Sequence, residues 1–149
     1  FFLAAIDGDT DAFNAVMDCF GLPKSTAAQK KERDLAIAAA TRQATRVPLS
    51  VLEKVPSLLE MAGEIGEIGN TNSLSDAGVA ALTGTAGAEG AYYNVLINLE
   101  SLRELDQSAE PDFSRDTRER AVTALEACEK LSNHIRAQIR GKLESVLDS

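Results

Sequence analysis

Apolar residues recur along this chain at the spacing of α-helices. In the first twenty residues they share one helical face, and the same spacing of three or four residues returns in each later segment. The pattern predicts helices over residues 1–20, 26–45, 48–69, 75–99 and 114–147. No segment alternates apolar and polar residues as a half-buried strand does. We therefore expect an all-α fold, a bundle of about five to six helices.

Polar and turn-forming residues separate these helices. A Gly-Leu-Pro-Lys turn over residues 21–24 ends the first. Thr26 and Gln29 have the spacing of a capping box, which starts the second. We predict a break before Pro48, because the residue that precedes a proline avoids the α conformation. Residues 106–112 are polar and contain a proline, so they are predicted to form a linker.

The chain is organised around residues 69–99, a polar turn followed by a long helix of small and apolar residues. Ser75 or Asp76 is positioned to cap this helix. At about 100° per residue, one narrow face of it has no bulky residue and a single charge. That face consists of Asp76, Ala80, Thr83, Gly87, Ala91, Asn94 and Asn98. Such a face either lets another helix approach closely or lines a binding site, and the residues alone leave both open.

One carboxylate stands out in the first predicted helix. If that helix is continuous, Asp9 falls in the centre of the apolar face, while Asp7 and Asp11 point the other way. A carboxylate among apolar side chains is costly unless it is paired or functional. The alternative is that Gly8 breaks the helix and Asp9 or Thr10 caps a new one. Both interpretations stay open at this point.

Length, charge and cysteine content limit the classes of function. A chain of 149 residues predicts one domain with a real core. A net charge of −8 argues against nucleic acid or an anionic membrane surface as the partner. No apolar run approaches the length of a membrane span. Cys19 and Cys128 lack metal-ligand spacing, so we predict free thiols in a cytoplasmic protein.

Several kinds of catalytic chemistry have no motif in this sequence. It contains no phosphate-binding loop, no dinucleotide fingerprint and no Cys/His cluster. The single histidine, His134, is interpreted as a surface or interface residue rather than a catalyst. Lys24, Lys30, Lys31 and Arg33 form a basic cluster, for which a solvated helix surface is the favoured interpretation. An enzyme built from this chain would use carboxylates, amides, hydroxyls and lysines, which suit proton transfer and the orientation of an organic substrate.

Five segments, taken together and in order, resemble the cyclodeaminase/cyclohydrolase family. They are IDGDTDAF (6–13), LPKST (22–26), VPL (47–49), GNTNSLSDAGVAA (69–81) and GAYYNVLINL (90–99). The family includes the C-terminal domain of formiminotransferase-cyclodeaminase and stand-alone methenyltetrahydrofolate cyclohydrolases. The family also has an N-terminal segment similar to GGGSVAA, and nothing in this chain matches it. We interpret residues 1–149 as a single helical domain of this type that lacks the glycine-rich segment.

The resemblance implies an all-helical folate enzyme that forms a homodimer or higher homo-oligomer and requires no metal or redox cofactor. A cyclodeaminase closes 5-formiminotetrahydrofolate to 5,10-methenyltetrahydrofolate and releases ammonia. A cyclohydrolase hydrolyses the methenyl form to the 10-formyl form. Which of the two reactions applies stays open. A hypothesis of another class is a non-catalytic dimerisation or scaffold module of the same fold, which the missing glycine-rich segment favours.

The resemblance also implies roles for five residues. Asp9, in the Ile-Asp-x-Asp motif, is the implied proton donor, and a carboxyl group that donates at neutral pH needs its pKa raised by burial. Asn94 and Asn98 would orient the pterin or the one-carbon unit by amide hydrogen bonds. Asp76 would cap its helix or contact the ligand. Lys24, with its lysine neighbours at positions 30 and 31, would meet the anionic glutamate tail.

Overall fold

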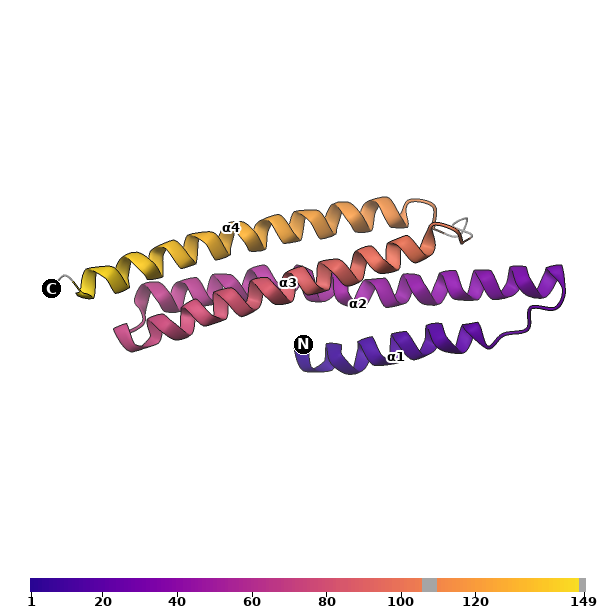
Figure 1. Ribbon diagram of the computed structural model, residues 1–149, viewed down its shortest axis with the longest axis horizontal. Coiled ribbons are helices and arrows are strands. Elements are labelled where there is room, and N and C mark those ends of the chain that lie inside the picture. The colour runs from indigo at the N-terminus through magenta and orange to yellow at the C-terminus, as the bar shows by residue number, and fades with distance from the viewer. Residues whose placement is uncertain (106–109, 148–149) are drawn as a thin grey trace.

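Four α-helices form the part of the chain that the computed structural model describes, which is residues 1–105 and 110–147, with Val146 described by its main chain only. The helices are α1 (Phe2–Phe20), α2 (Ala27–Ile68), α3 (Leu74–Leu102) and α4 (Phe113–Leu147), and a short 3₁₀ helix, η1 (Thr71–Ser73), lies between α2 and α3. Each helix runs antiparallel to the next, which gives an elongated up-and-down bundle (Figure 1). No strand occurs in these residues, so the all-α prediction is confirmed. The predicted number of five to six helices is wrong.

The helix count differs because α2 does not end before Pro48. It continues through Pro48 and Pro56 for 42 residues, or roughly 63 Å at the usual rise per residue. A proline removes one main-chain hydrogen bond and crowds the preceding turn. Here Pro48 and Leu49 are buried, and Ser50 donates a hydrogen bond from its Oγ atom to the Val47 carbonyl oxygen, 2.7 Å away. Burial of these residues favours a continuous helix where local propensity favours a break.

The predicted start of α2 is confirmed. The Oγ1 atom of Thr26 accepts a hydrogen bond from the main-chain N–H of Gln29 at 3.2 Å. In return, the Oε1 atom of Gln29 accepts one from the main-chain N–H of Thr26 at 3.1 Å. These reciprocal bonds satisfy two donors that a helix N-terminus otherwise leaves unpaired.

The side-chain cap before α3 comes from Asn70 and lies earlier in the chain than predicted. The Oδ1 atom of Asn70 accepts hydrogen bonds from the main-chain N–H groups of Asn72 and Ser73, which starts η1. Helix α3 then follows directly from Leu74. The prediction that Ser75 or Asp76 caps this helix is wrong, because both residues already lie inside its first turn.

The linker that follows α3 is only partly described. Residues 106–109 of the predicted linker lie outside the described part of the chain, and α4 begins at Phe113, directly after the described end of that linker.

The core lies between α2, α3 and α4. Its largest fully buried apolar side chains are Leu52, Leu59, Val95, Leu102, Cys128 and Ile135. Small residues on α3 let α2 approach closely, since a Cβ atom at Gly84 would lie 3.0 Å from the Cδ2 atom of Leu59. A bidentate ion pair between Arg120 and Glu53, at 2.8 and 2.9 Å, links α4 to α2 at the surface.

Helix α1 is the least covered element. It packs against the N-terminal half of α2 and makes no comparable contact with α3 (Figure 1). Ala12 is its one buried residue. Large apolar side chains of this helix that stay exposed are Phe2, Leu3, Ile6, Phe13, Met17 and Phe20. The apolar face of α1 that the sequence predicts is therefore present, but in the single chain it is exposed rather than buried in the core.

Candidate functional site

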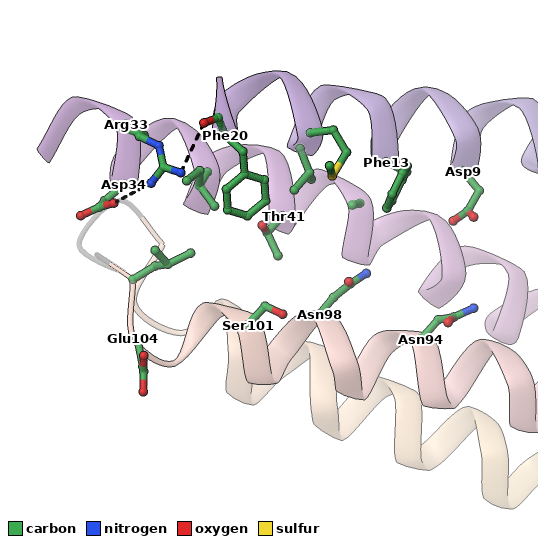
Figure 2. A pocket seen from close by; sticks show the side chains of 15 residues that line it. Asp9, Phe13, Phe20, Arg33, Asp34, Thr41, Asn94, Asn98, Ser101 and Glu104 are labelled. Atoms are coloured by element: carbon green, nitrogen blue, oxygen red, sulfur yellow. Dashed lines mark hydrogen bonds and ion pairs between the residues drawn. The ribbon is translucent and has the colours of Figure 1, made fainter. Parts of the chain in front are cut away.

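A groove separates α1 from α3, with α2 as its floor (Figure 2). Its volume of about 460 Å³ lies within the range of roughly 300–1,000 Å³ that is typical of small-molecule sites. The α1 wall is lined by Asp9, Phe13, Val16, Met17 and Phe20. The floor is lined by Arg33, Asp34, Ile37, Thr41 and Ala44. Residues Asn94, Asn98, Ser101 and Glu104 line the opposite wall, together with Leu105.

Asp9 reaches this groove because α1 is continuous. The helix passes through Gly8 without a break, and the Oγ1 atom of Thr10 donates to the carbonyl oxygen of Ile6, 3.1 Å away, within the helix. The interpretation of a new cap at Asp9 or Thr10 is therefore wrong. Asp9 lies one helical turn before Phe13, on the face that lines the groove.

Asn94 and Asn98 point toward α1 from the opposite wall, and Asn94 lies across the groove from Asp9 (Figure 2). A second cavity of about 380 Å³ continues from this point along α1 toward Phe2. Asp9 and Asn94 line both cavities. The two residues thus stand where the two spaces meet.

Two other predicted site residues lie elsewhere. Lys24 is exposed in the turn between α1 and α2, and Asp76 is exposed in the first turn of α3. Neither lines the groove or the second cavity. The start of α3 extends well beyond the N-terminal end of α1 in Figure 1. A carboxylate in the first turn of a helix is favourable there without any ligand, because it faces the positive end of the helix dipole.

The groove also contains polar residues that sequence reasoning missed. Ser101 follows Asn94 and Asn98 at helical spacing, so the face could have been extended by one more position. Thr41 is buried in the floor, and nothing in its sequence context distinguishes it from other threonines of α2. The sequence places Arg33 in the basic cluster, but it gives no indication that Arg33 lines the groove.

The charges in the groove are unequally distributed. Three carboxylates, of Asp9, Asp34 and Glu104, line it with a single guanidinium, that of Arg33. The side chains of Asp9, Asn94 and Asn98 make no hydrogen bond to any other residue in the described part of the chain, so all three are available to a ligand. Asp9 is exposed, so the single chain does not supply the burial expected of a neutral-pH proton donor.

Among residues 1–105 and 110–147, no group of three or more His, Cys, Asp or Glu side chains is placed to hold a metal ion. Cys19 and Cys128 are free thiols, as predicted. None of the described helices has the length and apolarity needed to cross a membrane. His134 is exposed on α4.

Fold and groove together define a class, an all-helical protein with an open groove of small-molecule size in which a carboxyl group lies opposite two amides. The family model described as formiminotransferase-cyclodeaminase matches residues 1–121. The chain belongs to this family, as the five segments had indicated.

Relatives with curated names agree with this assignment. The chain is 41% identical over 97 residues to methenyltetrahydrofolate cyclohydrolase of Methylorubrum extorquens, which covers 65% of this chain and 47% of that protein. It is 34% identical over 140 residues to formimidoyltransferase-cyclodeaminase of Rattus norvegicus, which covers 94% of this chain and 24% of that protein. The chain thus spans about half of the first relative and a quarter of the second.

A solved structure supports the fold. The crystal structure of formiminotetrahydrofolate cyclodeaminase from Thermotoga maritima matches 97% of this chain and 63% of its own, with a TM-score of 0.66 and 24% sequence identity. At this identity the match is evidence for the shared helical architecture alone.

Proposed function

We propose that this chain acts on one-carbon forms of tetrahydrofolate. The reaction is either the conversion of 5-formiminotetrahydrofolate to 5,10-methenyltetrahydrofolate with release of ammonia, or the hydrolysis of the methenyl form to the 10-formyl form. The observation that carries the proposal is the placement of Asp9 opposite Asn94 and near Asn98 across one groove of ligand size. The names of the two relatives support the same pair of reactions.

Both reactions need a proton moved at a tetrahedral carbon. In the first, N10 attacks the formimino carbon carried by N5. The imino nitrogen takes up two protons, the one that N10 loses and one from an acid, and leaves as ammonia. In the second, water adds to the methenyl carbon and the bond from that carbon to N5 breaks, with one proton of the water going to N5 and the other to a base. Asp9 would carry the proton in either case. The amides of Asn94 and Asn98 would orient the ring system. Neither reaction moves electrons to an acceptor, so the proposal includes no redox cofactor, and it keeps the expectation from the family resemblance that no metal is required.

The proposal includes a homodimer or higher homo-oligomer. The exposed apolar side chains of α1 support it, because a patch of this kind commonly marks an association surface. Association across this face would also remove water from the side of the groove where Asp9 is now exposed. Light scattering after size-exclusion chromatography should give at least twice the mass of one chain, and a monomer at micromolar concentration would contradict this part. The proposed location is the cytoplasm, which two free thiols support.

One absorbance assay tests the activity. Methenyltetrahydrofolate is followed in two reactions, one started with the formimino substrate and one with the methenyl substrate. Formation from the first identifies a cyclodeaminase, and loss of the second above the uncatalysed rate identifies a cyclohydrolase. No conversion in either reaction would reject the enzyme and favour a scaffold module of the same fold.

A further inference from the structure

The end of the groove away from Asp9 contains an incompletely paired arginine. The Arg33 side chain is only 17% exposed, and its Nε atom is buried without a hydrogen-bond partner in the described part of the chain. Its Nη2 atom lies 3.4 Å from the carbonyl oxygen of Phe20, which is longer than a usual N–H···O bond of about 2.7–3.2 Å. Its guanidinium carbon lies 5.3 Å from the centre of the Phe20 ring. A guanidinium has five donors, and most of these remain to be used.

Neighbouring carboxylates do not neutralise this arginine. The closest Asp34 oxygen is 4.0 Å from Nη1, and the Asp34 side chain is 51% exposed. Glu104 stands on the opposite wall and points away from Arg33 (Figure 2). Arg33 is therefore the one basic residue among those that line the groove in residues 1–105 and 110–147, and its charge is only weakly paired.

The groove has a fixed order of chemical character along its length. Asp9 and Asn94 stand at one end, the apolar side chain of Phe13 follows, and Arg33 lies over Phe20 at the other end (Figure 2). Met17, between Phe13 and Phe20 in the sequence of α1, also lines the groove. Asp9 and Phe20 are three helical turns apart, roughly 16 Å along α1. A folate has the same order, with the one-carbon nitrogens first, then the flat p-aminobenzoyl ring, then the carboxylates of glutamate.

We propose that Arg33 binds a carboxylate of the glutamyl tail and so fixes the direction in which the substrate lies in the groove. This assignment rests on the proposed folate function. The planar guanidinium fork can hold a carboxylate through two parallel N–H···O bonds. The apolar stretch between Asp9 and Arg33 covers the aromatic ring, and the one-carbon unit then lies beside Asp9. Arg33 takes the place that the sequence had assigned to Lys24.

The test compares one variant on two substrates that differ only in the tail. Arg33→Gln is assayed with the folate substrate that the unmodified protein converts, and with the matching pteroate compound, which lacks the glutamate. For the folate, KM should rise roughly tenfold to hundredfold, because a hydrogen bond to a charged group is lost. For the pteroate compound, KM should change by less than twofold. Arg33→Lys keeps the charge without the fork and should give an intermediate increase with the folate only.

The control removes the same charge elsewhere. Arg136→Gln, at an exposed position of α4, should leave KM for both compounds unchanged. If Arg33→Gln raises KM for both compounds equally, Arg33 only supports the groove through Phe20. The assignment is then overturned while the folate function stands. An unchanged KM for the folate also overturns it. If the unmodified protein neither converts nor binds either compound, the proposed function fails and the assignment with it.

Discussion

The Nζ atom of Lys142, near the end of α4, lies 2.8 Å from the main-chain carbonyl oxygen of Gly66, in the last turn of α2. It also donates to the carbonyl oxygen of Glu67, 2.7 Å away. The last carbonyl groups of a helix have no partner within the helix, and they carry the negative end of its dipole. A single ammonium group on α4 therefore satisfies two acceptors on α2 and joins the ends of the two longest helices.

Removing this ammonium should destabilise the bundle. Lys142→Met keeps the length of the apolar stem and loses the donors, so the free energy of unfolding should fall by about 1–2 kcal/mol. Urea unfolding followed by circular dichroism measures it. Lys130→Met, at an exposed position of the same helix, should change stability by less than about 0.5 kcal/mol. Equal effects of the two variants would show that the contact contributes nothing.

Asp9→Asn should abolish turnover while the fold is retained. The amide has nearly the same shape as the carboxylate but cannot donate or accept the proton, and loss of general acid–base catalysis typically lowers the rate by about 10²–10⁴-fold. Asp11→Asn is the matched control, because it makes the same change at an exposed position of α1 that lines neither cavity. Near-normal activity of Asp9→Asn, with an unchanged circular dichroism spectrum, would reject the role of Asp9.

Two glycines of α3 should respond differently to alanine. A Cβ atom at Gly84 would lie 3.0 Å from Leu59 Cδ2 and 3.3 Å from Leu58 Cδ2, whereas one at Gly87 would meet nothing within 4 Å. Both substitutions gain helix propensity, but only Gly84→Ala crowds the interface with α2. Gly84→Ala should therefore be less stable than Gly87→Ala by about 1 kcal/mol or more. Thermal unfolding of the pair checks this, and equal midpoints would mean that the leucines adjust without loss.

The two thiols should differ in reactivity. Burial raises the pKa of the Cys128 thiol to about 11, and the thiolate is the form that reacts. At pH 8, iodoacetamide should label Cys19, which is partly exposed, and leave Cys128 unlabelled. Both should react in denaturant, as mass spectrometry would show. Rapid labelling of Cys128 in the folded protein would contradict its burial.

The same pKa shift predicts a pH dependence of stability. The unfolded thiol ionises near its ordinary pKa of 9.0, whereas the folded thiol stays protonated until about pH 11. Between these values the unfolded state binds fewer protons than the folded state, so the free energy of unfolding falls as pH rises. Cys128→Ala should lose this part of the slope. Urea midpoints measured at pH 8, 9, 10 and 11 compare the two proteins.

Local features of the chain were predictable because they depend on neighbouring residues. The phase of apolar residues gives the helices and places Asp9 on the same face as Phe13. The capping box at Thr26 and Gln29 depends on residues three apart. The break before Pro48 was predicted wrongly, because local propensity contains no information on tertiary packing. The packing that keeps α2 continuous comes from residues distant in sequence.

The sequence by itself determined the helical class and the family. It also determined which face of α1 carries Asp9 and which face of α3 carries Asn94 and Asn98. Only the tertiary structure decided that α1 leaves its apolar face open beside α3, that Arg33 enters the groove, and that Lys24 and Asp76 lie outside it. On the narrow face of α3, the residues that line the two cavities are Gly87, Ala91, Asn94 and Asn98. Helical phase is a local property, so the spacing of residues along the chain is enough to predict it. Which helices leave a space between them depends on the packing of the whole chain, and no single segment predicts that packing.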